Sequence, residues 1–154
     1  MLYLPYEKYE IELKLSPKEV KERIFNNVET YLSFIFIMFY GSSKVFKGEF
    51  DDNKFFISRI IRGANSFLPI IKGVIYPDGS GCKIKIIMKL NVFVLVLWIF
   101  FIAFFLVNLL SINFKEQNYE NFLMLIFIYF FCIIPFNLEV KKAKQLLTEI
   151  LNDK

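Results

Sequence analysis

The chain has 154 residues, a net charge of +4, two cysteines and no histidine. The absence of histidine excludes the Ser-His-Asp triad and histidine-dependent metal sites, and it removes the commonest general base. Cys82 and Cys132 lack metal-site spacing, so we expect both to be buried small hydrophobic residues. Because neither a Walker loop nor a Gly-x-Gly-x-x-Gly motif occurs, the sequence predicts no cofactor. Acidic residues interleave with lysines from Glu7 to Glu29, so nucleic acid is not an expected partner.

The N-terminal part of the chain contains the pattern of a strand followed by a capped helix. Residues Tyr9–Leu15 alternate strictly between apolar and charged side chains, which predicts a half-buried strand. Ser16-Pro-Lys-Glu19 combines an N-cap serine, a proline at the first helical position and a glutamate at the third. This capping box predicts a helix that starts after Ser16, and apolar residues with helical spacing continue it to about Glu29.

The next segment, Tyr31–Tyr40, is apolar except for Ser33 and is too short to span a membrane as a helix. We interpret it as a buried strand. The alternative is that it forms the apolar end of the preceding helix and lies at the membrane interface.

A β-meander is predicted between residues 44 and 90. Its segments are separated by turn signals, of which Pro77–Gly81 is the strongest and Asp51–Asn53 is another. The glycines of the Pro77–Gly81 turn are expected to need positive φ. In the last strand, every second residue from Cys82 to Leu90 is expected to face inward. The predicted strands are Lys44–Phe50, Lys54–Ile61, Phe67–Tyr76 and Cys82–Leu90.

Two long apolar runs follow the meander, namely Val92–Val107, with sixteen residues and no charge, and Phe122–Phe136. Extended to nineteen residues, the first run would form a helix of about 28 Å, close to the hydrocarbon thickness of a bilayer. The second run reaches a comparable length over Tyr119–Leu138, with Pro135 near its end, where a membrane helix tolerates a missing N–H. The alternative is a buried hairpin of a soluble protein, but so small a chain has too little other structure to cover it.

Basic residues flank the two apolar runs unequally. Lysines gather before the first run and after the second, whereas the connecting loop has one lysine beside two glutamates. The positive-inside rule therefore predicts a multi-pass protein of the cell membrane with both termini in the cytoplasm. The lysines concerned are Lys83, Lys85, Lys89, Lys141, Lys142 and Lys144, and the loop lysine is Lys115.

The predicted fold class is α+β, and the chain is expected to consist of three segments. Residues 1–90 form a cytoplasmic domain of strand, helix and antiparallel meander, and residues 91–138 form a transmembrane helical hairpin with spans at about 91–110 and 119–138. Residues 139–154 form a C-terminal cytoplasmic helix. We expect this helix to pack back on the sheet instead of floating beside the membrane, because its apolar positions need a partner.

One segment, Arg59–Gly73, concentrates polar side chains that are suited to binding an anion. Arg59, Arg62 and Asn65 lie near Lys72, and clustered guanidinium groups make charge-assisted hydrogen bonds to phosphate oxygens. These four residues are the candidate ligand-binding surface for a phosphate-bearing ligand or anionic lipid headgroups. The alternative is a polar strand connection in which Asn65 satisfies the turn and regular alternation separates the two arginines onto opposite faces.

Two resemblances accompany these patterns. The order Phe46-Lys-Gly48, Asn65-Ser-Phe-Leu-Pro69, Gly73 and two apolar runs resembles small bacterial two-transmembrane proteins of uncharacterised function. This resemblance implies no activity and no site. The order of strand, capped helix, antiparallel meander and C-terminal helix is similar to that of helix-grip ligand-binding folds, although fold analogy alone does not give function.

The sequence therefore favours an integral membrane protein in which the hairpin anchors a non-enzymatic binding or regulatory domain. Its expected partners are the lipid bilayer, together with a partner protein, an anionic lipid headgroup or a small ligand. One alternative is a membrane enzyme acting on lipid, with Arg59, Arg62, Asn65 or Asp52 in its site. Another is a pore-forming or oligomeric effector, although the apolar runs lack charges and Gly-x-x-x-Gly, the features of a conducting or tightly packed bundle.

Overall fold

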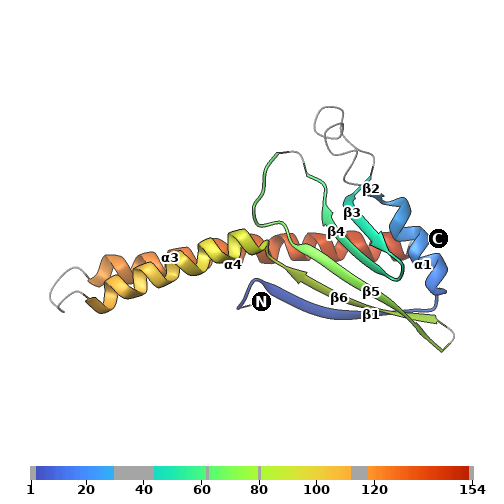
Figure 1. Ribbon diagram of the computed structural model, residues 1–154, viewed down its shortest axis with the longest axis horizontal. Coiled ribbons are helices and arrows are strands. Elements are labelled where there is room, and N and C mark those ends of the chain that lie inside the picture. Colours follow the sequence, from blue (N-terminus) through green and yellow to red (C-terminus); the bar gives the residue numbers. More distant parts are fainter. Residues whose placement is uncertain (1–2, 30–43, 62, 80, 112–117, 153–154) are drawn as a thin grey trace.

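The computed structural model describes residues 3–29, 44–61, 63–79, 81–111 and 118–152. Within these residues the chain is an α+β protein, as predicted, with a six-stranded sheet and three helices (Figure 1). The strands are β1 (Tyr6–Leu13), β2 (Val28–Glu29), β3 (Phe46–Asp51), β4 (Lys54–Arg59), β5 (Ile70–Asp78) and β6 (Gly81–Lys89). The helices are α1 (Pro17–Asn26), α3 (Val92–Ser111) and α4 (Asn118–Asn152).

The sheet has the strand order β1-β6-β5-β4-β3-β2, and its core is the predicted antiparallel meander. Strand β1 pairs antiparallel with β6 along its whole length, from Tyr6 opposite Lys89 to Leu13 opposite Cys82. The two-residue strand β2 is the parallel exception and pairs with β3. Since β6 ends at Lys89 and α3 begins at Val92, the strand next to the β1 edge leads almost directly into the helical hairpin.

Helix α1 begins with the predicted capping box. The Ser16 hydroxyl accepts a hydrogen bond from the Glu19 N–H at 3.3 Å, and the Glu19 carboxylate accepts one from the Ser16 N–H at 2.8 Å. The Ser16 hydroxyl also donates a hydrogen bond of 2.7 Å to the Glu19 carboxylate. This bond and the one from the Ser16 N–H lower the pKa of Glu19. The helix ends at Asn26, earlier than the predicted end near Glu29, because Val28 and Glu29 leave the helical path to pair with β3.

Helices α3 and α4 are each long and apolar enough to cross a membrane, by length and composition. The apolar stretch Val92–Leu110 has a mean hydropathy of 2.9, and the most apolar part of Tyr119–Asn152 has one of 2.2. The second predicted span and the predicted C-terminal helix are one helix, which has 35 residues and contains Pro135. Figure 1 shows α4 beside α3 over its first half and behind the sheet over its second half.

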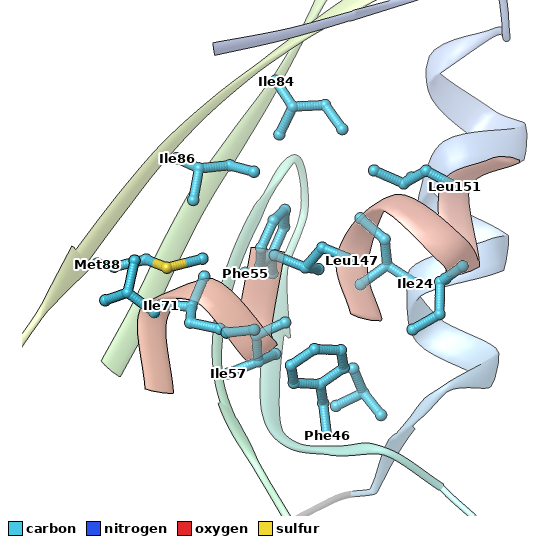
Figure 2. Close-up of a cluster of buried hydrophobic side chains, with 14 of the residues drawn as sticks. Ile24, Phe46, Phe55, Ile57, Ile71, Ile84, Ile86, Met88, Leu147 and Leu151 are labelled. Carbon is cyan, nitrogen blue, oxygen red and sulfur yellow. The ribbon is translucent and has the colours of Figure 1, made fainter. Parts of the chain in front are cut away.

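The core lies between one face of the sheet and the helices α1 and α4. The second half of α4 contributes its buried residues, so the predicted packing of the tail on the sheet is confirmed. Figure 2 shows Ile24 of α1 and Leu147 and Leu151 of α4 pointing toward the sheet. The alternate residues of β6 face inward as predicted, and those buried are Cys82, Ile84, Ile86, Met88 and, just beyond the strand, Leu90.

The turns follow the sequence signals in part. The Asp51–Asn53 turn is confirmed, and its Asp52 has a φ of 53°. The Pro77–Gly81 turn is tighter than predicted, because Asp78 still pairs with Gly81 at the end of the β5–β6 ladder. Gly79 has the expected positive φ, of 54°. The expectation for Gly81 was wrong: its constraint is space, since an added Cβ would lie 2.1 Å from the Leu13 carbonyl oxygen.

Two sequence predictions cannot be compared with the structure. The segment Tyr31–Tyr40, interpreted above as a buried strand, lies outside the described residues, and so does Arg62. Both remain predictions.

Gly73 on β5 packs so closely against a neighbouring ring that it has no room for a side chain. An added Cβ would lie 1.9 Å from Cζ of Phe55, a ring that is fully buried on β4. We expect Gly73→Ala to lower the free energy of unfolding of the purified full chain by about 1–3 kcal/mol, because the ring has no free space to move into. Denaturant titration measures this change.

The matched control is the same substitution in a Phe55→Leu background, where the obstructing ring is gone. There we expect Gly73→Ala to cost clearly less than in the native background. Equal costs in the two backgrounds would show that the ring does not impose glycine at this position.

Candidate functional site

Arg59, a predicted ligand-binding residue, lies on the inner face of the sheet. It pairs with Phe46 of β3, which is fully buried, and it alternates with the buried Phe55 and Ile57 along β4. Its guanidinium Nη2 lies 2.5 Å from Oε2 of Glu139 on α4, and the two side chains are only 18% and 8% exposed. The arginine is therefore held by a carboxylate of its own chain, inside the interface between sheet and helix.

A second ion pair joins α4 to the edge strand β1. The Lys144 ammonium contacts the Glu7 carboxylate and also lies 4.4 Å from the ring centre of Tyr9. Burial raises the pKa of the Tyr9 phenol, and the neighbouring Glu7 carboxylate raises that pKa further, so the phenol stays neutral at physiological pH. Glu7 and Tyr9 share the inner face because they alternate along β1.

The two ion pairs lie on opposite flanks of the buried stripe of α4. Val140, Ala143 and Leu147 are buried against the sheet. At about 100° per residue, Glu139 and Lys144 project on either side of this stripe, one toward β4 and the other toward β1. Because the helix carries the acid on one flank and the base on the other, turning it over would bring like charges together.

The remaining predicted site residues do not join Arg59. Lys72 pairs with Phe56 and Ile87 on the opposite, outer face of the sheet, where its ammonium lies 4.8 Å from the centre of the Phe56 ring. Asn65 lies in the connection before β5, and its side-chain oxygen accepts a hydrogen bond from the Phe67 N–H at 3.0 Å. Asn65 thus satisfies the turn, and the residues proposed from the sequence do not converge on one surface.

On strands β1, β6, β5 and β4, the outer face carries two groups of lysines. The distal lysines are Lys54, Lys83 and Lys85, and the proximal lysines, nearer to α3, are Lys8, Lys72 and Lys89. Lys83 lies 2.8 Å from a Glu12 carboxylate oxygen and 3.4 Å from one of Glu10, and Lys85 lies 3.9 Å from Glu10.

The hydrogen bond that the Lys83 ammonium donates to the Glu12 carboxylate lowers the pKa of Glu12 and raises the pKa of Lys83. Unlike Lys83 and Lys85, neither the proximal lysines nor Lys54 form an ion pair within the part of the chain that the structure describes. On β1 and β6, the outer face is therefore close to neutral at its distal end and cationic at its proximal end.

Sequence reasoning missed the ion-pair residues Glu7, Glu139 and Lys144. For Glu7 a signal existed, because it occupies the same alternating set as Tyr9 and Ile11 and so belongs to the inner face. Arg59 likewise follows Phe55 and Ile57 in alternation. The partners on α4 carried no such local signal, because contact between residues 80 positions apart depends on the tertiary packing.

The acidic residues do not assemble a catalytic or metal centre in the described ranges. No group of three or more Cys, Asp or Glu side chains is placed to hold a metal ion there. Asp52 lies at the β3–β4 turn, is 89% exposed and pairs with Lys21 at 3.7 Å. It is separated from Arg59 by the length of β4, so the two do not share a site.

Comparison of the chain with protein-family models, with curated proteins and with solved structures found no match.

The buried pair of Arg59 and Glu139 generates a stability prediction. Glu139→Leu leaves a guanidinium with a buried, unpartnered Nε and no carboxylate, and we expect it to lower the free energy of unfolding by about 3–5 kcal/mol. Arg59→Met should lower the free energy of unfolding by less, because the Lys142 ammonium, 3.4 Å from the Glu139 carboxylate, still provides a positive charge. The double variant should be more stable than the sum of the two single changes implies.

Denaturant unfolding of the four chains measures this coupling. The control is Lys21→Met, which removes an exposed ion pair and should change stability by less than about 0.5 kcal/mol. Strict additivity of the two buried substitutions would contradict the account of the pair.

Proposed function

We propose that this protein is a membrane-anchored, non-enzymatic binding module, in which the α3–α4 hairpin lies in the cell membrane and the sheet domain lies in the cytoplasm. The observation that carries the proposal is the continuity of α4. Its first half is apolar and largely exposed, and its second half packs into the core of the sheet domain. With its first half in a membrane, this one helix would therefore anchor the sheet domain directly to the bilayer.

The exposure of the hairpin supports this placement. No side chain described in Val92–Leu110 is buried, and the large exposed residues of α3 include Phe93, Phe100 and Phe104. Exposed apolar surface is unfavourable in water by about 25 cal/mol per Å², and hydrocarbon removes this cost. The sheet leaves most of the hairpin uncovered, because it lies beside the second half of α4.

The distribution of lysines supports the proposed orientation. Lys83, Lys85 and Lys89 precede α3, and Lys141 and Lys142 follow the apolar half of α4. The described start of α4, at the opposite end of the hairpin, carries Glu120. Both termini then belong on the cytoplasmic side, following the positive-inside rule.

A lipid-acting enzyme has less support than a binding module. Its proposed residues Arg59 and Asp52 lie at opposite ends of β4, and Arg59 is already paired with Glu139. The described residues also leave Asn65 engaged in its own turn. A binding role requires only an accessible surface, which the outer face of the sheet supplies.

Reporter fusions test the proposed topology. We expect a reporter that is active only in the cytoplasm to be active when fused after Lys154, and inactive when inserted at Gln117. A reporter that is active only outside the cytoplasm should give the opposite result at the two positions. Immunoblots must show full-length fusions in the membrane fraction. An inactive C-terminal cytoplasmic reporter on a full-length chain would contradict the orientation, and full-length fusions in the soluble fraction would contradict the anchoring.

A further inference from the structure

We propose that the proximal lysines Lys8, Lys72 and Lys89 bind the headgroups of anionic phospholipids in the leaflet next to the sheet domain. This inference rests on the proposed membrane anchoring and adds the chemical class of the partner. It assigns the binding role to the outer face of the sheet, at the end nearest to α3.

The sheet domain contacts α4 within the apolar half of the helix. The Tyr129 hydroxyl of α4 donates a hydrogen bond to the Tyr3 carbonyl oxygen at 2.8 Å, and the rings of Phe67 and Phe131 lie 5.7 Å apart. Tyr129 and Phe131 precede Glu139 by ten and eight residues, which is about 15 Å and 12 Å along the helix. The segments of the domain that contain Tyr3 and Phe67 therefore lie beside the apolar half of α4.

Aromatic side chains mark the same level on both helices. The Trp98 ring of α3 lies 6.3 Å from the Tyr129 ring, and its indole N–H donates to the Ile128 carbonyl oxygen at 3.2 Å. Trp98 lies six residues, or about 9 Å, beyond the start of the candidate span Val92–Leu110. With the bilayer surface at the start of that span, the exposed side chains of Tyr3 and Leu4 lie among the lipids.

The proximal lysines lie near the start of α3, on the side of the sheet domain. Lys89 precedes α3 by three residues, and Tyr6 and Ile70 are its partners on the neighbouring strands. Lys8 and Lys72 lie one step further along the sheet, on either side of Ile87. Because adjacent strands are about 4.8 Å apart, the Cα atoms of the Lys8–Ile87–Lys72 row span about 10 Å, comparable to the Debye length at physiological salt.

The two ends of the outer face differ in charge. The distal Lys83 and Lys85 are neutralised by Glu10 and Glu12, whereas the proximal lysines make no ion pair within the described residues. The Lys72 ammonium lies over the ring of Phe56. Long cationic side chains pack against apolar surface in this way at interfaces. Across β1, β6 and β5, the outer face therefore becomes cationic toward its membrane end, which is complementary to an anionic leaflet.

The lone tryptophan, Trp98, provides the readout. The full chain is reconstituted in phosphatidylcholine vesicles that contain either dibrominated phosphatidylcholine or dibrominated phosphatidylglycerol. Bromine quenches tryptophan only at short range, so the ratio of quenching by the two lipids reports the preference for the anionic lipid beside Trp98. We expect the native chain to prefer phosphatidylglycerol at least fivefold, since each lysine near the surface contributes about a factor of five.

The test variant is Lys8→Gln, Lys72→Gln and Lys89→Gln together, for which the preference should fall to nearly one. The matched control is Lys54→Gln, Lys83→Gln and Lys85→Gln together. It removes the same charge from the distal end of the same face and should retain at least half of the native preference. Far-UV circular dichroism of the reconstituted chains verifies that both variants keep the fold.

The outcomes separate the two proposals. Equal losses in the test and control variants, or no preference in the native chain, would overturn the lipid site while leaving the membrane anchoring intact. Absence of quenching by either brominated lipid would overturn the anchoring itself, and the lipid site with it. Loss confined to the proximal variant, together with a native preference that weakens in 0.5 M salt, is the result that the inference requires.

Discussion

Helix α4 is exposed over its first half and packs against the sheet over its second half, and the rest of the structure depends on this change within one continuous helix. Up to Phe131 none of its described side chains is buried, and from Cys132 onward one stripe of the helix is buried. Pro135 lies at the beginning of this buried stripe and deprives the Phe131 carbonyl of its usual helical donor. The helix nevertheless continues, because Phe136, Val140, Ala143 and Leu147 fall on one side and pack together against the sheet.

The ion pairs on either side of that stripe explain how the helix keeps its orientation. Burial of apolar side chains holds α4 to the sheet but does not distinguish one rotation from its neighbours. The pairs Arg59–Glu139 and Glu7–Lys144 place opposite charges on the two flanks, so a rotated or reversed helix would leave partly buried charges unpaired. The Arg23 side chain adds a hydrogen bond of 2.8 Å to the Leu151 carbonyl oxygen near the end of α4. Helix α1 therefore helps to hold the far end of α4 in place.

The parts of the fold that follow from local sequence were predictable, because their causes lie within a few residues. The capping box at Ser16, the alternation in β6 and the Asp51–Asn53 turn each depend on neighbours in the chain. The continuity of α4 was missed, because the change from apolar to charged residues at Glu139 resembles the end of a membrane span. The spacing of Phe136, Val140, Ala143 and Leu147 held the evidence for one helix.

The candidate site was harder to predict than the fold. Arg59 attracted attention as a potential anion ligand, but its alternation with Phe55 and Ile57 makes it an inward residue that finds its own carboxylate. Lys72 belongs to the other face. The grouping of Lys72 with Lys8 and Lys89 depends on the register between β1, β6 and β5, which joins residues far apart in the chain. The sequence alone does not reveal this register.

The most direct test of the account is the distance across the change of surroundings in α4. Nitroxide labels at Phe127→Cys and Thr148→Cys, both exposed positions, are introduced with Cys82 and Cys132 replaced by alanine. Pulsed electron paramagnetic resonance of the chain in vesicles should give one narrow distribution near about 31 Å, the length of 21 residues of unbroken helix. A broad distribution, or a clearly shorter distance, would show that the hairpin and the sheet domain are not joined by one rigid helix.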